Sequence, residues 1–135
     1  MSDLDRLEGH AREAVDCGYR LHRELGPGLL ESAYDALMAE ALRQRGTRAE
    51  RQVTVLLQYY GVVVDNVFKI DLLVERLLLI ELKLVERIVP VHGKQLLTYL
   101  RLMRLPFGPL MNFGGATFKV ALRGVANDYY GAIGN

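Results

Sequence analysis

The sequence contains a single cysteine, Cys17, among its 135 residues. One thiol forms neither an internal disulfide nor a zinc cluster. No basic segment followed by an apolar one precedes the first predicted helix, so the start of the sequence does not indicate a secretory signal. The longest apolar run is far shorter than the about 20 residues that a membrane span requires. These absences favour a cytoplasmic protein in a reducing compartment.

The sequence also has almost no net charge, with a formal value of +1. Any binding to nucleic acid would therefore depend on a local basic patch rather than on the field of the whole molecule. Half of the residues are hydrophobic and 24% are charged, which is ordinary for a folded protein. Low-complexity segments and repeats are absent. The length predicts one domain, residues 1–135, that buries about two-thirds of the surface of its unfolded chain.

Two helices are predicted at the start of the chain. Apolar residues at three- and four-residue steps predict an amphipathic helix from Asp3 to Leu25. Within it, Cys17 is interpreted as a small core residue and His22 as a surface or helix-end residue. The Gly-Pro-Gly sequence that follows ends this helix. A second helix is predicted from Leu29 to Arg45, with a buried side made of Leu30, Ala33, Tyr34, Leu37 and Ala41.

Most of the remaining chain has the patterns of strands. Strict alternation predicts a half-buried strand from Arg48 to Tyr60. The other predicted elements are a strand over Val62–Val74, bulged around Asp65-Asn66, a strand over Leu77–Leu84, a helix over Val91–Met103, strands over Phe107–Phe113 and Ala116–Leu122, and a fraying tail from Arg123. An antiparallel meander of three strands, extended through a crossover helix, predicts an α/β sandwich.

Charged residues interrupt the most apolar part of this pattern, residues 70–83. Two apolar runs of strand length flank Glu75-Arg76, which is short and polar enough to form the turn of a β-hairpin. With that turn, Asp71 lies beside Ile80 and within about one residue of Glu81. The hairpin therefore predicts that two carboxylates lie close together.

A lysine joins this predicted pair. Glu81 and Lys83 are two residues apart, so they point to the same face of a strand. An isolated Glu-x-Lys usually lies on the solvent face of an edge strand, but the neighbouring runs are almost wholly apolar, and buried charges need a partner or a metal. Two carboxylates suit Mg²⁺ or Mn²⁺, and an ammonium would bind a phosphate oxygen or orient an attacking water. This combination indicates metal-assisted phosphodiester hydrolysis.

Several motifs resemble those of a known family. Gly28 to Tyr34 spells G-x-x-E-x-x-Y, the signature of the small bacterial and archaeal GxxExxY family, and the resemblance continues through Asp71, the Glu81-Leu82-Lys83 triplet, PVHGKQLLTYLRL and LMNFG. That family is similar to PD-(D/E)XK nucleases. Gln95 to Tyr99 also resembles the Q-x-x-x-Y motif of RecB-like nucleases. The chain departs from the usual signature in having Ile, rather than Pro, before Asp71.

The resemblance implies an α/β fold with a three-layer-like core of the restriction-endonuclease type (αβββαβ), a mixed sheet, two N-terminal helices and a crossover helix. It implies a Mg²⁺ or Mn²⁺ cofactor and nucleic acid as the partner, with DNA favoured over RNA. The resemblance implies that the metal ligands are Asp71, Glu81 and Glu31. It implies a catalytic group of Lys83, Asp71, Glu81 and Gln95. Tyr99 and His92 are implied to position substrate or water.

Two of these residues have simpler interpretations from the sequence alone. Glu31 is in the first turn of a predicted helix, where a carboxylate complements the helix dipole; only the resemblance makes it a site residue. His92 is either a substrate contact or the N-terminal residue of its helix. These interpretations stay open at the level of the sequence.

Three functions are compatible with the pattern. The first is a metal-dependent nuclease. The second is a nuclease-fold module with slow or absent turnover that binds nucleic acid or a protein partner. The third is a structural or interaction protein in which Asp71, Glu81 and Lys83 form a buried ion-pair network. The sequence leaves open whether the chain forms a homodimer or is recruited by another protein.

Overall fold

A computed structural model describes residues 2–125 of the protein, apart from the side chains of Asn66 and Val67. Its elements are α1 (Asp3–Leu25), α2 (Glu31–Gln44), β1 (Ala49–Tyr59), β2 (Val62–Val74), β3 (Leu78–Lys83), α3 (Pro90–Met103), β4 (Phe107–Asn112) and β5 (Lys119–Gly124). The element order is the predicted one. Of the predicted fraying tail, Arg123 and Gly124 belong to β5, and residues 126–135 lie outside the described residues.

The five strands form one mixed sheet in the order β1-β2-β3-β4-β5. The first three strands are an antiparallel meander, β3 and β4 are parallel, and β5 returns antiparallel to β4. A parallel pair cannot be joined by a tight turn, and α3 provides the long connection that this pair needs. The structure is therefore the predicted α/β fold, consistent with a PD-(D/E)XK nuclease-type core.

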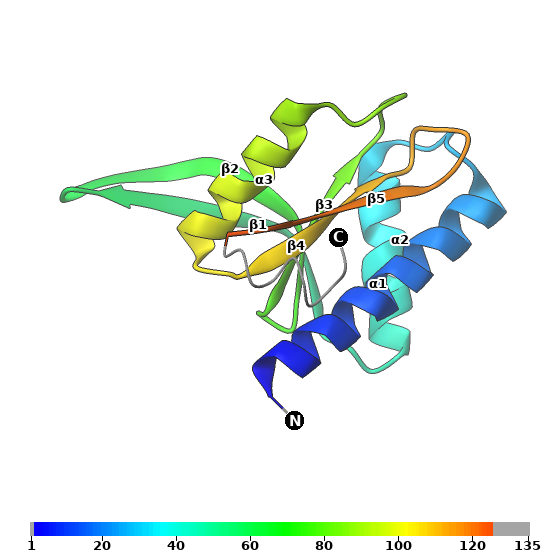
Figure 1. The fold of residues 1–135 in the computed structure, drawn as a ribbon, viewed down its shortest axis with the longest axis horizontal. Coiled ribbons are helices and arrows are strands. Elements are labelled where there is room, and N and C mark those ends of the chain that lie inside the picture. Colours follow the sequence, from blue (N-terminus) through cyan, green and yellow to red (C-terminus); the bar gives the residue numbers. More distant parts are fainter. Residues whose placement is uncertain (1, 126–135) are drawn as a thin grey trace.

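Helices cover both faces of the sheet, as Figure 1 shows. One apolar cluster joins α1 and α2 to one face, and a second joins α3 to the other. Both faces of β3 are consequently buried, which explains the unbroken apolar run in its sequence. Within residues 2–125 no helix has the length and hydropathy that a membrane crossing requires.

The buried side of α1 is close to the prediction, with one correction at its end. Cys17 is buried in the core, as predicted, and burial raises the pKa of its thiol. His22 is in the last turn of α1 but is buried rather than at the surface, because its Nε2 lies 2.8 Å from the carbonyl oxygen of Gly115. The ring also lies near the rings of Phe113 and Phe118.

The buried side of α2 differs from the prediction. Leu30 and Leu37 were expected in the core, but they are 79% and 38% exposed. The buried residues are Tyr34, Asp35, Met38, Ala39 and Leu42. The helix is therefore rotated relative to the stripe that its apolar residues alone define, and a carboxylate takes a core-facing position.

The turn between β2 and β3 is one residue longer than predicted. Val74 pairs with Leu78, so Leu77 belongs to the turn together with Glu75 and Arg76. Glu75 and Arg76 have φ angles of 52° and 54°, and the N–H of Leu77 donates to the carbonyl of Val74 at 2.9 Å. This extra residue shifts the pairing of the two strands by one position.

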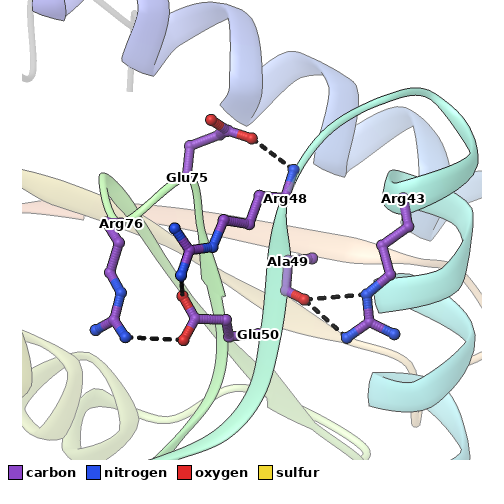
Figure 2. A network of polar contacts seen from close by, with 6 residues as sticks. All are labelled: Arg43, Arg48, Ala49, Glu50, Glu75 and Arg76. Carbon is purple, nitrogen blue, oxygen red and sulfur yellow. Dashed lines mark hydrogen bonds and ion pairs between the residues drawn. The ribbon is translucent and has the colours of Figure 1, made fainter.

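Polar contacts with Arg48 and with the start of β1 hold this turn in its left-handed conformation (Figure 2). The main chains of Arg48 and Glu75 are linked by a hydrogen bond of 2.9 Å, and the Glu75 carboxylate accepts from the N–H of Arg48. Glu50 forms ion pairs with Arg48 at 3.5 Å and with Arg76 at 2.9 Å. Arg43 donates to the intervening carbonyl of β1. These contacts offset the strain of two non-glycine residues at positive φ.

Candidate active site

The shifted register brings Asp71 directly opposite Glu81. Leu72 pairs with Ile80, and one further step along both strands reaches the two acidic residues. The N–H of Leu82 donates to Oδ2 of Asp71 at 2.8 Å, and the N–H of Asp71 donates to Oε1 of Glu81 at 3.4 Å. The prediction that Asp71 lies beside Ile80 is therefore wrong by one residue, because Leu77 is part of the turn.

Both carboxylates are buried, with 7% of each residue exposed. Burial raises the pKa of Asp71 to about 6, while the hydrogen bond from Leu82 opposes this shift. Burial, reinforced by repulsion from Asp71, raises the pKa of Glu81 to about 8. Strongly shifted carboxyl groups that lie together are typical of functional sites.

Lys83 lies on the same face of β3 as Glu81, at the end of the strand. Its positive charge opposes the rise in the pKa values of Glu31, Asp71 and Glu81 that burial causes. All of these groups therefore lie within its electrostatic reach. Among the described residues, no ion pair joins Lys83 to Asp71 or Glu81 within 4.0 Å. The three groups are therefore not a closed salt-bridge network.

The end of β4 holds the backbone that follows Lys83. Asn112 is buried, and its side chain accepts from the N–H of Val85 at 3.1 Å and donates to the carbonyl of Val85 at 2.8 Å. The N–H of Phe113 donates to the carbonyl of Lys83 at 2.8 Å. A Cβ on Gly114 would lie 2.4 Å from the N of Val85, so only glycine fits there. The LMNFG sequence thus fixes where β3 ends.

Glu31 is the first residue of α2, and Tyr34 fixes the approach to it. The Tyr34 ring is fully buried and stacks on Phe113 with centroids 4.5 Å apart. Its hydroxyl donates to the carbonyl of Gly26 and accepts from the N–H of Leu29. The tyrosine of the G-x-x-E-x-x-Y motif therefore ties down the loop before α2. Glu31 is exposed as a whole, but partial desolvation of its carboxylate raises its pKa, and its charge in turn raises the pKa of Asp71.

A second acidic residue of α2, Asp35, was not singled out from the sequence. It lies one turn after Glu31 and is fully buried, and its charge raises the pKa values of Glu31 and Asp71. Oδ1 accepts from Nε of Arg51 at 2.8 Å, and Oδ2 accepts from the amide of Gln52. The four-residue spacing between Glu31 and Asp35 was the available signal, because such residues share a helix face.

Arg51 is expected to be essential for keeping Asp35 in this position. Arg51→Ala leaves the carboxylate of Asp35 buried without its guanidinium, which lies 2.7 Å away. We expect a loss of about 3 kcal/mol in the free energy of unfolding, measured by urea denaturation. The double variant Asp35→Asn/Arg51→Met is expected to recover much of it, because no charge is then left unpaired. A loss below about 1 kcal/mol in Arg51→Ala would contradict this account.

Gln52 marks a change of face in the long β1–β2 ribbon. Its φ is 51°, and it follows Arg51, which pairs with Leu72. Leu72 packs in the cluster below α1 and α2, whereas Ile70, two residues away on β2, packs in the cluster below α3. In a regular strand, residues two apart lie on the same face of the sheet. Because Ile70 and Leu72 pack on opposite faces, the ribbon twists sharply between them. Asp71 lies at this twist.

Of the three predicted positioning residues, all on α3, Tyr99 is the one whose interactions place it near the carboxylates. Tyr99 stacks on Phe68 with centroids 4.1 Å apart, and burial together with the charges of Glu81 and Asp71 raises the pKa of its hydroxyl. Gln95 lies one turn earlier on α3 and is exposed. Nδ1 of His92 accepts from the N–H of Val89 at 3.1 Å, which gives His92 a role at the start of the helix.

The donor set of the hairpin fits a divalent cation. Asp71 and Glu81 offer hard carboxylate oxygens in a buried setting that opposes their negative charge, and Mg²⁺ and Mn²⁺ prefer such ligands. Within the described part of the chain, no group of three or more His, Cys, Asp or Glu residues is placed to hold a metal ion. The fit therefore depends on Asp71 and Glu81, with Glu31 and Asp35 as nearby carboxylates.

Comparisons with known proteins agree with this architecture. Curated proteins yielded no match. The solved structure described as "Crystal structure of SSO0001" is similar to the chain with a TM-score of 0.51 and 19% identity, over 97% of this chain and 80% of that one. That likeness concerns the fold alone. A family model described as "PD-(D/E)XK nuclease superfamily" matches residues 8–125. Because the match spans most of the chain, the protein belongs to the PD-(D/E)XK nuclease superfamily.

Proposed function

We propose that the protein is a divalent-metal-dependent nuclease that hydrolyses phosphodiester bonds, with DNA as the preferred nucleic acid. Membership of the superfamily suggests a nuclease, and nucleases of this superfamily generally use divalent metals. The observation that carries the proposal is the opposition of Asp71 and Glu81 on paired strands, with Lys83 on the same face. The G-x-x-E-x-x-Y sequence supports assignment to the GxxExxY subfamily within this superfamily.

In this proposal Asp71 and Glu81 hold the cation, and Glu31, whose charge reaches Asp71 from α2, adds negative charge beside it without completing a three-residue ligand group in this structure. The raised pKa values of the pair favour protonation when no cation is present, so cation and protons compete for the same oxygens. When bound, a divalent cation supplies Lewis-acid stabilisation of the negative charge that develops on the phosphate. Mg²⁺ and Mn²⁺ are the ions that this donor set suits best.

The remaining side chains act on water and substrate. The Lys83 ammonium donates to a phosphate oxygen or orients the attacking water, where it stabilises charge that grows towards the transition state. Tyr99 and Gln95, one turn apart on α3, position the substrate or water. Water adds to phosphorus and gives up a proton to solvent, the P–O bond to the sugar oxygen breaks, and the departing oxygen takes a proton from solvent to leave as a hydroxyl group. Asp35 acts indirectly, because its contacts with Arg51 hold α2 and Glu31 against β1.

A cleavage screen tests the proposal. The purified protein is incubated with single-stranded DNA, duplex DNA, branched DNA and RNA, at several concentrations of Mg²⁺ or Mn²⁺. We expect cleavage of at least one substrate, abolished by chelation and by Asp71→Asn. Asparagine keeps an oxygen that accepts from Leu82 but lacks the charge, so the fold is preserved.

The matched control for Asp71→Asn is Asp16→Asn. Asp16 is a partly exposed carboxylate of α1 that forms ion pairs with Arg20 and Arg45. Cleavage should persist in Asp16→Asn. Equal cleavage by wild type and Asp71→Asn would exclude this site as the source of activity. Metal binding without cleavage of any substrate would identify the alternative, a nuclease-fold module that binds nucleic acid or a protein partner.

A further inference from the structure

The hairpin end of β1 and β2 forms an apolar arm, defined here as residues 54–68. In Figure 1 it extends beyond α3, and no other described element lies beside its tip. Tyr59 pairs with Val62 across a two-residue turn, in which Tyr60 and Gly61 have φ angles of 47° and 78°. Both positive angles are typical of a tight type I′ hairpin. The arm is therefore an ordered ribbon with few neighbours in its own chain.

Large apolar side chains are exposed along this arm. The exposed fractions are 44% for Leu56, 67% for Tyr59, 90% for Tyr60, 60% for Val62, 55% for Val63 and 45% for Val64. Three of these residues are consecutive, so side chains on both faces of the ribbon are exposed. A contiguous apolar surface of this kind marks an interaction site.

The charge of the arm argues against nucleic acid as its occupant. No charged residue occurs between Arg51 and Asp65, and Asp65 is the only charged residue in the arm itself. Binding to the phosphate backbone requires lysine or arginine, which the arm lacks. The occupant must instead be apolar and carry little charge.

The outer edge of β1 has the same character. β1 is at the end of the strand order, so within residues 2–125 no strand pairs with its outer edge. Exposed edge strands are normally protected by charges, proline or a covering segment. Residues 53–59 contain neither charge nor proline. An edge of this kind is suited to pairing with another strand.

We propose that β1 of one copy pairs antiparallel with β1 of a second copy, with the two-fold axis at Leu56. This register places Val55 opposite Leu57, and Thr54 opposite Gln58, in both halves of the pair. Apolar residues then face apolar ones, and no like charges face each other. A two-fold interface requires this self-complementarity, because each surface meets itself.

Pairing along this edge covers the exposed apolar side chains that β1 itself carries, Leu56 and Tyr59, whereas Val62, Val63 and Val64 belong to β2 and lie outside the paired edge. Main-chain hydrogen bonds along the paired edges add to this contact.

Two variants that place opposite charges at position 56 test the proposal, because in this register Leu56 of one copy faces Leu56 of the other. Wild type is expected to sediment at twice 15.2 kDa in analytical ultracentrifugation. Leu56→Lys and Leu56→Glu are each expected to raise the dimer dissociation constant by at least about 100-fold. Mixing the two variants is expected to restore the dimer, because lysine then faces glutamate.

The matched control is Leu25→Lys, at a leucine of α1 that is 49% exposed, and circular dichroism verifies that every variant is folded. Leu25→Lys should remain dimeric. A monomeric wild type, or a dimer that neither Leu56 variant weakens, would overturn the proposal. Loss of the dimer in both variants without recovery on mixing would overturn the two-fold register at Leu56. A monomer whose arm variants lose affinity for single-stranded DNA would assign the arm to nucleic acid instead. These readouts require no cleavage activity, so they are independent of the proposed function.

Discussion

Lys83→Ala is expected to slow phosphodiester cleavage by about 10² to 10³-fold, by analogy with the removal of a donor that stabilises developing charge. The lysine is not a metal ligand, so the two carboxylates of the hairpin remain available to bind the cation. Its positive charge reaches Asp71 and Glu81 without forming an ion pair with them, as expected for a group that acts on substrate. The loss should therefore appear in the single-turnover rate, with a much smaller change in substrate affinity.

Single-turnover cleavage and calorimetric titration with Mn²⁺ separate the two effects. Arg12→Ala is the control for removing a cation, because the Arg12 side chain is 75% exposed on α1. It should cut at the wild-type rate. If Lys83→Ala cut as fast as wild type, Lys83 would be a structural counter-ion of the carboxylates. If Lys83→Ala lost metal binding as well as cleavage, the separation of roles proposed for the site would be wrong.

Glu81→Gln is expected to have opposite effects on stability without and with metal. In the metal-free protein the pKa of Glu81 is raised to about 8, so the folded state binds more protons than the unfolded state between about pH 4.5 and pH 8. Stability should therefore fall as pH rises through this range. Asp71, with its pKa raised to about 6, contributes in the same direction at lower pH.

Removing the Glu81 charge should lessen this fall. We expect Glu81→Gln to raise the free energy of unfolding at pH 8 by on the order of 3 kcal/mol, with little change at pH 4.5. The measurement is urea denaturation with a chelator present. Glu86→Gln, at an exposed position after β3, is the control and should leave the pH dependence unchanged. Parallel pH profiles for Glu81→Gln and wild type would contradict the assignment of the buried charge.

Adding metal should reverse the order of stability. Mn²⁺ at about 1,000 times its dissociation constant stabilises a single-site protein by about 4.1 kcal/mol, more than the about 3 kcal/mol by which the variant leads without metal. Wild type should gain this stability at pH 8 and gain less at pH 6, where protons compete for the carboxylates. Glu81→Gln should gain little at either pH. An equal rise in melting temperature for wild type and variant would place the metal elsewhere.

Local patterns in the sequence were sufficient for much of the fold. A helix from about Asp3 to Leu25 was predicted and α1 spans that range, because apolar spacing and the Gly-Pro-Gly stop are both local signals. The strands flanking Glu75-Arg76 were recognised for the same reason. The closeness of Asp71 and Glu81 followed from two strands and a tight turn, so an error of one residue in the turn changed their register without separating them.

Asp35 shows what local patterns miss. A polar residue in a helix is expected to face solvent, yet Asp35 is fully buried because Arg51 and Gln52, both on β1, provide hydrogen bonds to its carboxylate. No pattern within α2 contains that information. The same dependence on a distant partner explains why His22 is buried against Gly115.

The sequence by itself determined the order of the elements, the hairpin that carries the carboxylates, and the motifs of the superfamily, because each depends on residues close together along the chain. Only the tertiary structure decided which face of α2 is buried, that Asp71 faces Glu81, and that the β1–β2 arm extends beyond α3. These features depend on contacts between segments that are distant in sequence. Their energies come from the burial and pairing of groups that no local periodicity specifies.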